Sequence, residues 1–458
     1  MYKGDYMEYG CIYNENVKDS YSENSVCGNT ISGKTVLITG GYGGVGVAAA
    51  FRFLREGCKV YIAGRNKDKL SSAITYLRRK IQSAGVEGIL LDICSFSSIQ
   101  KVIKNIETKQ IKIDILVHCI GWGTDADIEG KFLDIEKKYF DYVYDINYAG
   151  IVAFTESIYE KMRWEPGEKQ IVMVGSVAAI FKKYQFTPYG IAKTALEEYV
   201  YQLSQKDAHI SVMIVEPGGI ATSLVGSGVG DEITCDGNIL HRRLLPEEIA
   251  AFIAFSCSEG IGKRLNGNAV EMSACEAVSY NEKTAVCPLE MNLKQYGSRL
   301  ESYAGNSLEN ETIQLETNLN GKSADILKAE LFKEGCNIAV VSGKTTHVMC
   351  FMDCDGMETV KDIYQILQKD SIRCIDQGEK GIFSVCVMLS DIGGECKIAG
   401  KTLEKMLEGL GEKMAQHGIY VNGVVATARV PLLEVIHCGI YLNSKYGRIL
   451  TGEVLRLA

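Results

Sequence analysis

The 458-residue chain is poor in proline (6) and tryptophan (2), and no apolar run in it approaches the roughly 20 residues of a membrane-spanning helix. None of its 16 cysteines forms a C-x-x-C pair. Several of them, including Cys58, Cys94, Cys119 and Cys386, lie in or beside apolar strand-like runs, where a free thiol behaves as a small hydrophobic group. The N-terminus lacks the apolar core of a secretory signal. We therefore expect a cytoplasmic protein that does not span a membrane.

Positive charge is scarce as well. Lysine and arginine number 49 against 57 aspartates and glutamates, which gives a net charge of −8. A nucleic-acid-binding protein normally presents a basic face, so we expect no nucleic-acid partner. Hydrophobic residues make up 46% of the chain and charged residues 23%, as in ordinary globular proteins. Because single cores rarely grow beyond about 250–300 residues, this length predicts two domains.

Strand-like and helical segments alternate from Lys34 onward. Apolar strand-like runs occupy 35–39, 58–64, 87–92, 113–121, 170–176, 209–217 and 267–274, and helical patterns lie between the early ones, at 47–57, 68–85 and 96–108. This alternation indicates right-handed βαβ units. The predicted fold is therefore an α/β, Rossmann-type doubly wound parallel sheet.

The chain is predicted to divide into four parts. Residues 1–30 are polar and aperiodic and are expected to form a flexible arm, or an arm that orders on a partner subunit or over the active site. Residues 31–276 form the first and larger domain. Residues 277–310 lack an apolar period and serve as a linker. Residues 311–458 form a second, smaller Rossmann-like α/β domain.

The second domain resembles the first in sequence. With Thr317 placed beneath Thr39, a gap-free register runs to Cys336 beneath Cys58, and five of the twenty positions are identical. Further similar segments pair 351–363 with 90–102, 418–425 with 209–216, and 448–458 with 264–274. We interpret these matches as a tandem duplication. The alternative is that any two βαβ segments look alike.

The second copy lacks the groups that would bind a dinucleotide. In the same register the glycines at 40, 44 and 46 are replaced by Asn318, Lys322 and Ala324, whose Cβ atoms would keep the backbone away from a pyrophosphate. Asp353 and Ser390 are 37 residues apart, whereas Asp92 and Ser176, the residues that they would match in the first domain, are 84 residues apart. This difference indicates a missing strand–helix unit. The next helix also lacks a tyrosine four residues before a lysine, a pair that the first domain has at Tyr189 and Lys193. We predict a domain without a cofactor site.

A glycine-rich loop, TGGYGGVG at 39–46, lies between the first strand and the first helix. That context is the one in which such a loop binds a pyrophosphate, because the N–H groups and the dipole of the helix N-terminus favour phosphate. Two glycine spacings, T-G-x-x-x-G-x-G and T-G-x-x-G-x-x-G, are satisfied together. A purely structural turn is the alternative.

The end of the second strand, Gly64-Arg65-Asn66, contains no carboxylate before Asp68. A carboxylate there would accept hydrogen bonds from the ribose 2′-hydroxyl of NAD. Arg65 instead offers a guanidinium group suited to a 2′-phosphate. The sequence thus favours NADP(H) over NAD(H), with a solvated arginine in a turn as the alternative.

Tyr189 and Lys193 lie four residues apart in Y-G-I-A-K, thirteen residues after Ser176. A free tyrosine has a pKa near 10, but an ammonium group one helical turn away favours the phenolate, and a shift of about three units requires roughly 4 kcal/mol. Ser176, at the end of a strand, would hold a carbonyl oxygen where negative charge develops. Alone, Tyr189 would be a surface aromatic and Ser176 a turn residue. Together they predict an acid–base site.

Residues 31–275 resemble a short-chain dehydrogenase/reductase. The similarity rests on TGGYGGVG, Asp92 after the third strand, Asn147 in D-I-N-Y-A-G, Ser176, Y-G-I-A-K and P-G-G-I-A-T at 217–222. The resemblance implies that Asn147 helps a water relay to Lys193, and that Lys193 also holds the nicotinamide ribose. It implies catalytic roles for Asn147, Ser176, Tyr189 and Lys193.

The same resemblance implies a set of dinucleotide contacts, with Asp92 near the adenine and the segment from Pro217 to Thr222 along the nicotinamide amide. The residues expected to bind the cofactor are Thr39, Gly40, Gly43, Gly44, Val45, Gly46, Arg65, Asp92, Ile93, Gly121, Tyr189, Lys193, Pro217, Gly218, Ile220 and Thr222. No metal site is expected. One departure is His118 in H-C-I-G, where the family usually has N-N-A-G; a core histidine is the favoured interpretation, and cofactor affinity is the property it puts in question.

The predicted function is NADP(H)-dependent interconversion of a ketone and a secondary alcohol. Substrate contacts are expected from loops at 121–130, 177–188 and 223–243, which carry Trp122 and the cations Lys182, Lys183, His241, Arg242 and Arg243. Those cations could steer an anionic substrate such as a 3-oxoacyl thioester or a polyketide-like carbonyl compound, with ordinary solvated charge as the alternative. Other readings are an NADP(H) sensor or scaffold without turnover, and an NAD-dependent hydroxy-compound dehydrogenase. The second domain is expected to pack as a pseudo-dimer partner, which leaves room for further homo-oligomers.

Overall fold

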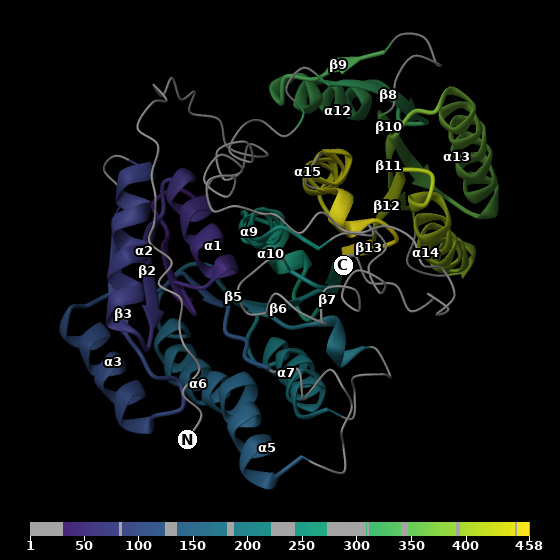
Figure 1. Ribbon diagram of the computed structural model, residues 1–458. Coiled ribbons are helices and arrows are strands. Elements are labelled where there is room, and N and C mark those ends of the chain that lie inside the picture. The colour runs from purple at the N-terminus through teal and green to yellow at the C-terminus, as the bar shows by residue number, and fades with distance from the viewer. Residues whose placement is uncertain are drawn as a thin grey trace.

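The structure is a computed structural model. It describes residues 31–81, 85–123, 135–180, 187–220, 243–272, 308, 311–339, 347–390, 394–444 and 447–457. The predicted arm at 1–30 lies outside these residues, and so does the predicted linker apart from the buried Leu308. Two parallel sheets make up the described part of the chain (Figure 1). None of the described helices combines the length and apolar character needed to cross a membrane.

The first sheet has seven parallel strands in the order β3-β2-β1-β4-β5-β6-β7. The order reverses between β1 and β4, which is where a doubly wound sheet opens a crevice for a ligand. The predicted fold class is confirmed. The strands are β1 Thr35–Thr39, β2 Lys59–Gly64, β3 Val86–Leu90, β4 Ile115–His118, β5 Lys169–Val174, β6 Ile210–Pro217 and β7 Ala269–Met272.

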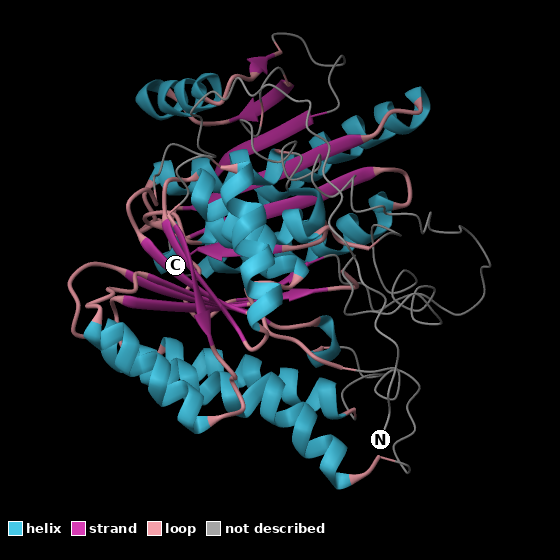
Figure 2. Cartoon of the chain, turned by 60° about the vertical axis from the view of Figure 1, so that its left-hand side comes forward, coloured by secondary structure: helices cyan, strands magenta, loops and turns pink. Residues whose placement is uncertain are grey.

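Helices cover both faces of the first sheet (Figure 2). Successive residues of β1 enter different cores: Val36 and Ile38 pack with α1, whereas Leu37 packs with α6. This explains why the strand is continuously apolar rather than alternating. On one face lie α1 Gly44–Arg55, α2 Lys67–Lys80 and α9 Pro246–Ser256, and on the other α3 Phe96–Thr108, α6 Gly150–Met162 and α7 Pro188–Ser204.

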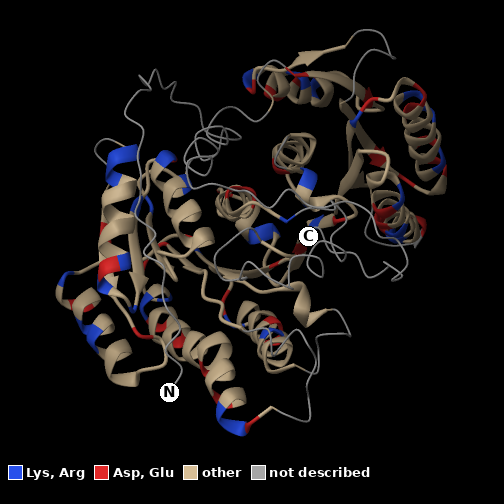
Figure 3. Cartoon of the chain, viewed as in Figure 1, with Lys and Arg blue, Asp and Glu red and all other residues tan. Residues whose placement is uncertain are grey.

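The second sheet has six parallel strands in the order β13-β12-β11-β10-β8-β9. Helices α12 Gly321–Lys333 and α15 Leu432–Asn443 pack on one face, and α13 Met357–Gln377 and α14 Gly394–Ala415 on the other. The strands are β8 Thr312–Thr317, β9 Asn337–Ile338, β10 His347–Cys354, β11 Gly381–Leu389, β12 Ile419–Ala426 and β13 Val454–Leu457. Residues of both signs of charge lie together on α3, α13 and α14 (Figure 3).

The two sheets share local details of hydrogen bonding. Gly57 and Gly335 both have positive φ, at 80° and 77°, and the following Cys58 and Cys336 each donate a backbone N–H to the carbonyl five residues earlier. Near the other end, Gly267 and Gly452 have φ of 77° and 79°. Their N–H groups donate at 2.7 Å to Val212 in β6 and Val421 in β12, respectively. The turns at corresponding places are therefore built alike.

The strand pairing corrects three details of the predicted alignment. Thr35 pairs with Lys59 and Thr312 with Asn337, so Glu316, not Thr317, occupies the place of Thr39. The loop after β8 therefore contains one extra residue, and the gap-free register holds only toward the end of the helix. Because Gly267 matches Gly452, the alignment of 448–458 with 264–274 must also be shifted by one residue.

The third correction concerns the missing unit. The sequence alignment matched 351–363 to 90–102, which begins at the end of β3. In the structure β10 pairs with β8 and β11, as β4 pairs with β1 and β5, so this segment corresponds in position to β4. The described part of the second sheet has no strand in the place that β3 occupies at the edge of the first sheet. Pairing also places Met388 where Ser176 would be expected, two residues before Ser390.

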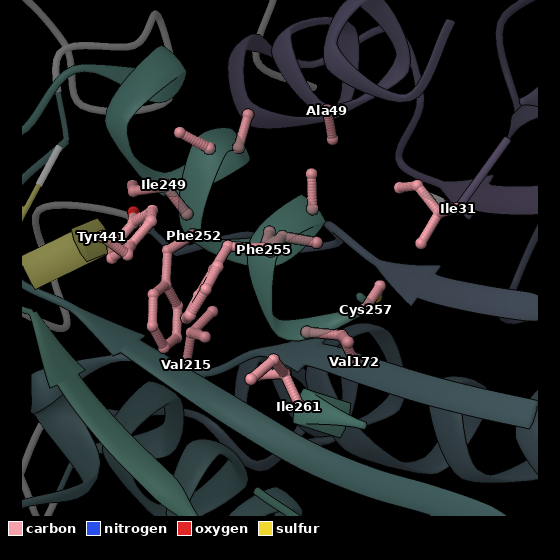
Figure 4. Packing of buried hydrophobic residues seen from close by; sticks show 14 of the residues in the cluster. Ile31, Ala49, Val172, Val215, Ile249, Phe252, Phe255, Cys257, Ile261 and Tyr441 are labelled. Carbon is pink, nitrogen blue, oxygen red and sulfur yellow. The ribbon is translucent and has the colours of Figure 1, made fainter. Parts of the chain in front are cut away.

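The helices α9 and α15 lie between the two sheets. All eleven residues of α9 are buried, because the first sheet covers one side of the helix and α15 lies against the other. Tyr441 of α15 stacks on Phe255 with ring centroids 4.3 Å apart and meets Phe252 edge-on at 5.8 Å (Figure 4). A second contact joins the two domains, because Arg264 Nε and Glu434 Oε2 of α15 form an ion pair at 2.7 Å. One hydrophobic core thus extends from the first sheet to the second.

Candidate active site

The predicted site residues gather at the carboxyl edge of the first sheet. Thr39 ends β1, Arg65 follows β2, Asp92 follows β3, Gly121 follows β4 and Ser176 follows β5. Parallel strands bring their carboxyl ends to the same edge, so residues that are far apart in the sequence become neighbours. This edge is the candidate active site.

The glycine loop is shaped by close backbone contacts. Gly40 has φ +67°, and a Cβ there would lie 2.6 Å from the carbonyl oxygen of Cys119. A Cβ on Gly46 would lie 2.3 Å from the oxygen of Gly40. The helix begins at Gly44, its N-cap Gly43 has no capping side chain, and the first turn has no acidic residue. A pyrophosphate fits this cradle, since the backbone can approach closely and the dipole favours an anion.

His118 braces the sheet from inside. Its Nδ1 lies 2.8 Å from Thr39 Oγ1, and its Nε2 lies 2.9 Å from Thr155 Oγ1 in α6. Since the Thr155 hydroxyl donates to the carbonyl of Ile151, Nε2 carries the ring proton and Nδ1 accepts. Burial lowers the pKa of His118 to about 3, with a further lowering by Lys193. His118 is a neutral core histidine, as expected, and it supplies a brace between β1 and α6 in place of an asparagine.

Asn147 lies in a single widened turn, the π-helix η2 Asp145–Ala149, between α5 Lys137–Tyr144 and α6. Such turns often mark functional positions in helices. The Asn147 side chain is fully buried and clasps the backbone of Trp122: Oδ1 accepts from its N–H at 3.0 Å, and Nδ2 donates to its carbonyl at 2.7 Å. A second donation from Nδ2 reaches Val143 at 2.8 Å. The amide thereby fixes the backbone at Trp122, just beyond the end of β4.

Tyr189 and Lys193 occupy the first turns of α7. The helix begins at Pro188, and the Thr187 hydroxyl caps it by accepting from the N–H of Gly190 at 3.0 Å. Lys193 Nζ lies 5.6 Å from the centre of the Tyr189 ring, so the two side chains share one face. The ammonium donates to the carbonyls of Ile120 at 3.2 Å and Val174 at 3.0 Å. It is therefore held between the ends of β4 and β5.

Burial lowers the pKa of Lys193 to about 8, against which the nearby Glu216 acts in the opposite direction. Its side chain is 1% exposed, so any negative charge that develops nearby is poorly screened by solvent. Lys193 keeps most of its charge at neutral pH. The arrangement is a buried cation beside a phenol.

Ser176 lies immediately after β5, half-buried, and its Oγ accepts from the N–H of Ala178 at 3.2 Å. The short 3-10 helix η3 Val177–Ala179 follows it. Thr194 of α7 donates to the carbonyl of Ala179 at 3.3 Å, which joins this turn to the Tyr189–Lys193 helix. Ser176 is thus brought to the same edge and tied to α7 through the turn.

The adenosine side of the crevice contains Arg65 and Asp92. Arg65 is exposed and its Nη1 donates to the hydroxyl of Tyr142 at 3.3 Å, which is the main cause that raises the pKa of its guanidinium. Asp92 accepts from the N–H of Cys94 at 3.1 Å. Ile93 is buried, and its carbonyl is approached so closely by Gly150 that a Cβ there would lie 2.5 Å away.

The remaining predicted residues are only partly described. Pro217 ends β6, the N–H of Gly218 donates to Met272 at 3.0 Å, and Ile220 bridges to Leu244. Val45 is buried in the first turn of α1. Arg243 is half-buried. Outside the described residues lie Thr222, Lys182, Lys183, His241 and Arg242.

Glu216 was not among the predicted site residues. It is 1% exposed, directly precedes Pro217, and among the described residues neither carboxylate oxygen has a hydrogen-bond partner. Burial raises its pKa to about 9, with further increases from Glu197 in α7 and from the neighbouring Glu271, and Lys193 opposes them. The sequence signal was a glutamate next to the end of a largely apolar strand. Burial therefore favours the protonated form of the Glu216 carboxyl group.

The corresponding edge of the second sheet is built differently. The Asn318 side chain donates to the carbonyl of Asp353 and accepts from its N–H, both at 2.8 Å. This double hydrogen bond joins the ends of β8 and β10, at the place where β1 and β4 flank the glycine loop in the first sheet. Helix α14 contains no tyrosine.

The doubly wound sheet, its switch point and the glycine cradle at the start of α1 define a Rossmann-type dinucleotide-binding fold. The family profile of short chain dehydrogenases matches residues 34–232. A dehydrogenase/reductase SDR family protein 7-like from Drosophila melanogaster is 31% identical over 222 residues, which cover 46% of this chain and 67% of that protein. The chain belongs to the short-chain dehydrogenase/reductase family, whose members are NAD(P)-dependent oxidoreductases acting on alcohol and carbonyl groups.

Two further similarities were found. Acetoacetyl-CoA reductase from Allochromatium vinosum is 25% identical over 241 residues, or 51% of this chain and 95% of that protein. The crystal structure of L-sorbose reductase from Gluconobacter frateurii, complexed with NADPH and L-sorbose, is 23% identical. It covers 55% of this chain and 98% of that chain, with a TM-score of 0.48.

Proposed function

We propose that the protein interconverts a ketone and a secondary alcohol, with Tyr189 as the proton donor or acceptor. The observation that carries this proposal is the placement of the buried Lys193 ammonium 5.6 Å from the Tyr189 ring centre, between two strand ends. Such a cation favours the charged form of the phenol and makes proton transfer at neutral pH feasible.

The other residues complete the proton path. Ser176 at the end of β5 would donate a hydrogen bond to the substrate oxygen as it gains negative charge, and Tyr189 would deliver the proton to that oxygen. Lys193 would orient the nicotinamide ribose and would favour the phenolate form of Tyr189. Asn147 would support a water relay to Lys193, a role compatible with its place in the widened turn η2. When bound, the reduced nicotinamide supplies the hydride.

The preferred cofactor in this proposal is NADP(H). Arg65 is exposed at the end of β2, and its guanidinium is aimed by Tyr142 rather than by a carboxylate. Planar guanidinium groups suit phosphate oxygens. In the proposed complex Gly40, Gly43 and the first turn of α1 hold the pyrophosphate, and Asp92 lies near the adenine. Gly121, Ile93 and the segment from Pro217 to Thr222 line the remaining length of the cofactor.

For the substrate we propose a 3-oxoacyl thioester or a related carbonyl compound. The similarity to an acetoacetyl-CoA reductase supports this class. So does the cluster of cations in the loops at 177–188 and 223–243 of an otherwise acidic protein. Reversing Lys182, Lys183 and Arg242 to glutamate should lower kcat/KM for the anionic thioester severalfold and spare a neutral ketone. Equal values for both substrates in the variant and the wild type would exclude the idea.

We further propose that the second domain is a degenerate copy of the first, without a cofactor site, that packs in the place of a partner subunit. The supports are the shared strand order without a β3 counterpart, the Asn318 bridge across the crevice, and the contact between α9 and α15. In each domain the helix that makes this contact is followed by one short helix, α10 Ile261–Arg264 or η4 Gly447–Leu450, and then by the last strand. Deleting 311–458 should expose apolar α9 and cause aggregation or new oligomers. A monodisperse, fully active truncated monomer would contradict this role.

The decisive test follows NADPH absorbance with a panel of ketones and thioesters. Tyr189→Phe should lower kcat by about 10²–10⁴-fold, as expected for loss of a general acid, while NADPH binding stays within a few fold of wild type. Tyr201→Phe, which removes an exposed hydroxyl from the same helix, is the matched control. Wild-type protein that binds NADPH but reduces no member of the panel would favour a sensor or scaffold instead.

A further inference from the structure

An aromatic group on α5 connects the adenosine side of the crevice to the loop after β4. Tyr139 and Tyr142 are three residues apart on this helix and therefore project from the same face. Both rings contact Trp122: Tyr142 meets it edge-on with centroids 4.9 Å apart and planes at 78°, and Tyr139 lies at 6.0 Å. Trp122 itself is clasped by the Asn147 side chain.

The hydroxyl of the same Tyr142 accepts the hydrogen bond from Arg65 Nη1 at 3.3 Å. Arg65 also lies near Tyr42 and Asp92, which add smaller favourable electrostatic contributions to its guanidinium. Tyr42 comes from the glycine loop, and its ring lies so close to Gly64 that a Cβ there would be 2.2 Å from Cε1. The arginine is therefore bounded by fixed groups from three elements rather than free to sweep through solvent.

We propose that Tyr142 is a positioning residue for recognition of the cofactor's 2′-phosphate. We also propose that binding of this phosphate at Arg65 changes the surroundings of Trp122 through the ring of Tyr142. The inference rests on the proposed NADP(H) preference. An exposed arginine loses side-chain entropy when it binds an anion, and a hydroxyl that already holds one guanidinium N–H reduces that loss. The remaining N–H groups stay available for phosphate oxygens. The edge-on contact with Trp122 then joins Arg65 mechanically to the loop that Asn147 fixes.

The two tryptophans make this testable, because Trp164 is 78% exposed and replaceable. In a Trp164→Phe background, Trp122 is the sole tryptophan and its fluorescence reports on the contact with Tyr142. The probes are adenosine 2′,5′-bisphosphate, which carries the 2′-phosphate, and 5′-AMP, which lacks it. Tyr142→Phe keeps the ring and removes the hydroxyl, Tyr142→Ala removes both, and Tyr144→Phe removes a hydroxyl from the same helix as the matched control.

The expected result has three parts. Tyr142→Phe should weaken binding of adenosine 2′,5′-bisphosphate about three- to tenfold, as for the loss of one ordinary solvent-exposed hydrogen bond, and leave 5′-AMP within twofold. KM for NADPH should rise to a similar extent with kcat unchanged, which a general folding defect would not produce. The bisphosphate should change Trp122 fluorescence in the Trp164→Phe parent, much less in Tyr142→Phe, which lacks the hydrogen bond to Arg65, and not at all in Tyr142→Ala.

The controls separate this inference from the proposal on which it rests. If the parent protein binds the bisphosphate no better than 5′-AMP, the NADP(H) preference itself is wrong. If the parent shows the preference and Tyr142→Phe binds the bisphosphate as tightly or more tightly, the preference stands and the positioning role of Tyr142 is overturned. A fluorescence response retained in Tyr142→Ala would overturn the link to Trp122.

Discussion

The contact between α9 and α15 provides a quantitative test of whether the two domains stabilise each other. The Phe255 and Tyr441 side chains are 3% and 0% exposed and stack at 4.3 Å. Replacing either by alanine should lower the free energy of unfolding by about 3–5 kcal/mol, the usual cost of removing a buried aromatic side chain. The pair should also show a coupling energy of about 1–2 kcal/mol, because the stacked rings attract each other and both substitutions enlarge one shared cavity.

Urea unfolding with two probes can measure this coupling. Both tryptophans, at 122 and 164, belong to the first domain, so tryptophan fluorescence follows that domain while far-ultraviolet circular dichroism follows both. Tyr441→Ala lies in the second domain, yet it should shift the fluorescence midpoint. Phe383, fully buried on the opposite face of the second sheet, provides the control: Phe255→Ala and Phe383→Ala should be additive.

Two outcomes would refute the reasoning. One is a coupling energy between Phe255→Ala and Tyr441→Ala below about 0.5 kcal/mol, which is the range of independent sites. The other is an unchanged fluorescence midpoint in Tyr441→Ala while circular dichroism shows a weakened second domain. Either result would mean that the domains unfold independently despite the shared core.

Three further predictions concern the active-site edge. Burial raises the pKa of Glu216 from 4.5 to about 9. The contribution of this group to stability is therefore full below pH 4.5 and is lost as the pH rises toward 9. The melting temperature of Glu216→Gln should consequently rise relative to that of the wild type between about pH 5 and pH 9. His118→Phe should cost about 1–3 kcal/mol of stability by leaving two threonine hydroxyls without the ring. Because the pKa of His118 is lowered to about 3, that cost should be largest above pH 6.5 and shrink as the pH falls. Gly46→Ala places a Cβ 2.3 Å from the Gly40 oxygen and should weaken NADPH binding at least tenfold (more than about 1.4 kcal/mol), whereas Gly409→Ala, with open space at its Cβ, should not.

Each of these has a clear contrary result. Parallel melting curves of Glu216→Gln and wild type across the pH range would show that the carboxyl group titrates normally. A stability gap for His118→Phe that widens toward pH 5 would mean that the imidazole is charged in the folded protein. Unchanged NADPH affinity in Gly46→Ala would show that the loop rearranges at little cost. Isothermal titration and differential scanning calorimetry give these quantities directly.

Local patterns in the sequence were sufficient for the architecture of the first domain. The apolar run at 35–39 became β1 with the same limits, and the predicted helix at 96–108 became α3. The repeat was harder to align, because an insertion of one residue after β8 shifts strand register without changing composition. The match of 351–363 to the third strand failed for a related reason: an apolar strand followed by a helix fits either β3 or β4 until its neighbours are known.

By itself the sequence determined the alternation of strands and helices, the glycine loop and the four-residue spacing of Tyr189 and Lys193, since each depends on residues close together in the chain. Only the tertiary structure decided that Arg65 meets Tyr142, that His118 bridges Thr39 to α6, and that Glu216 is buried without a hydrogen-bond partner among the described residues. Those relations join side chains on different elements. Their burial and charge depend on how the layers pack, which no local pattern encodes.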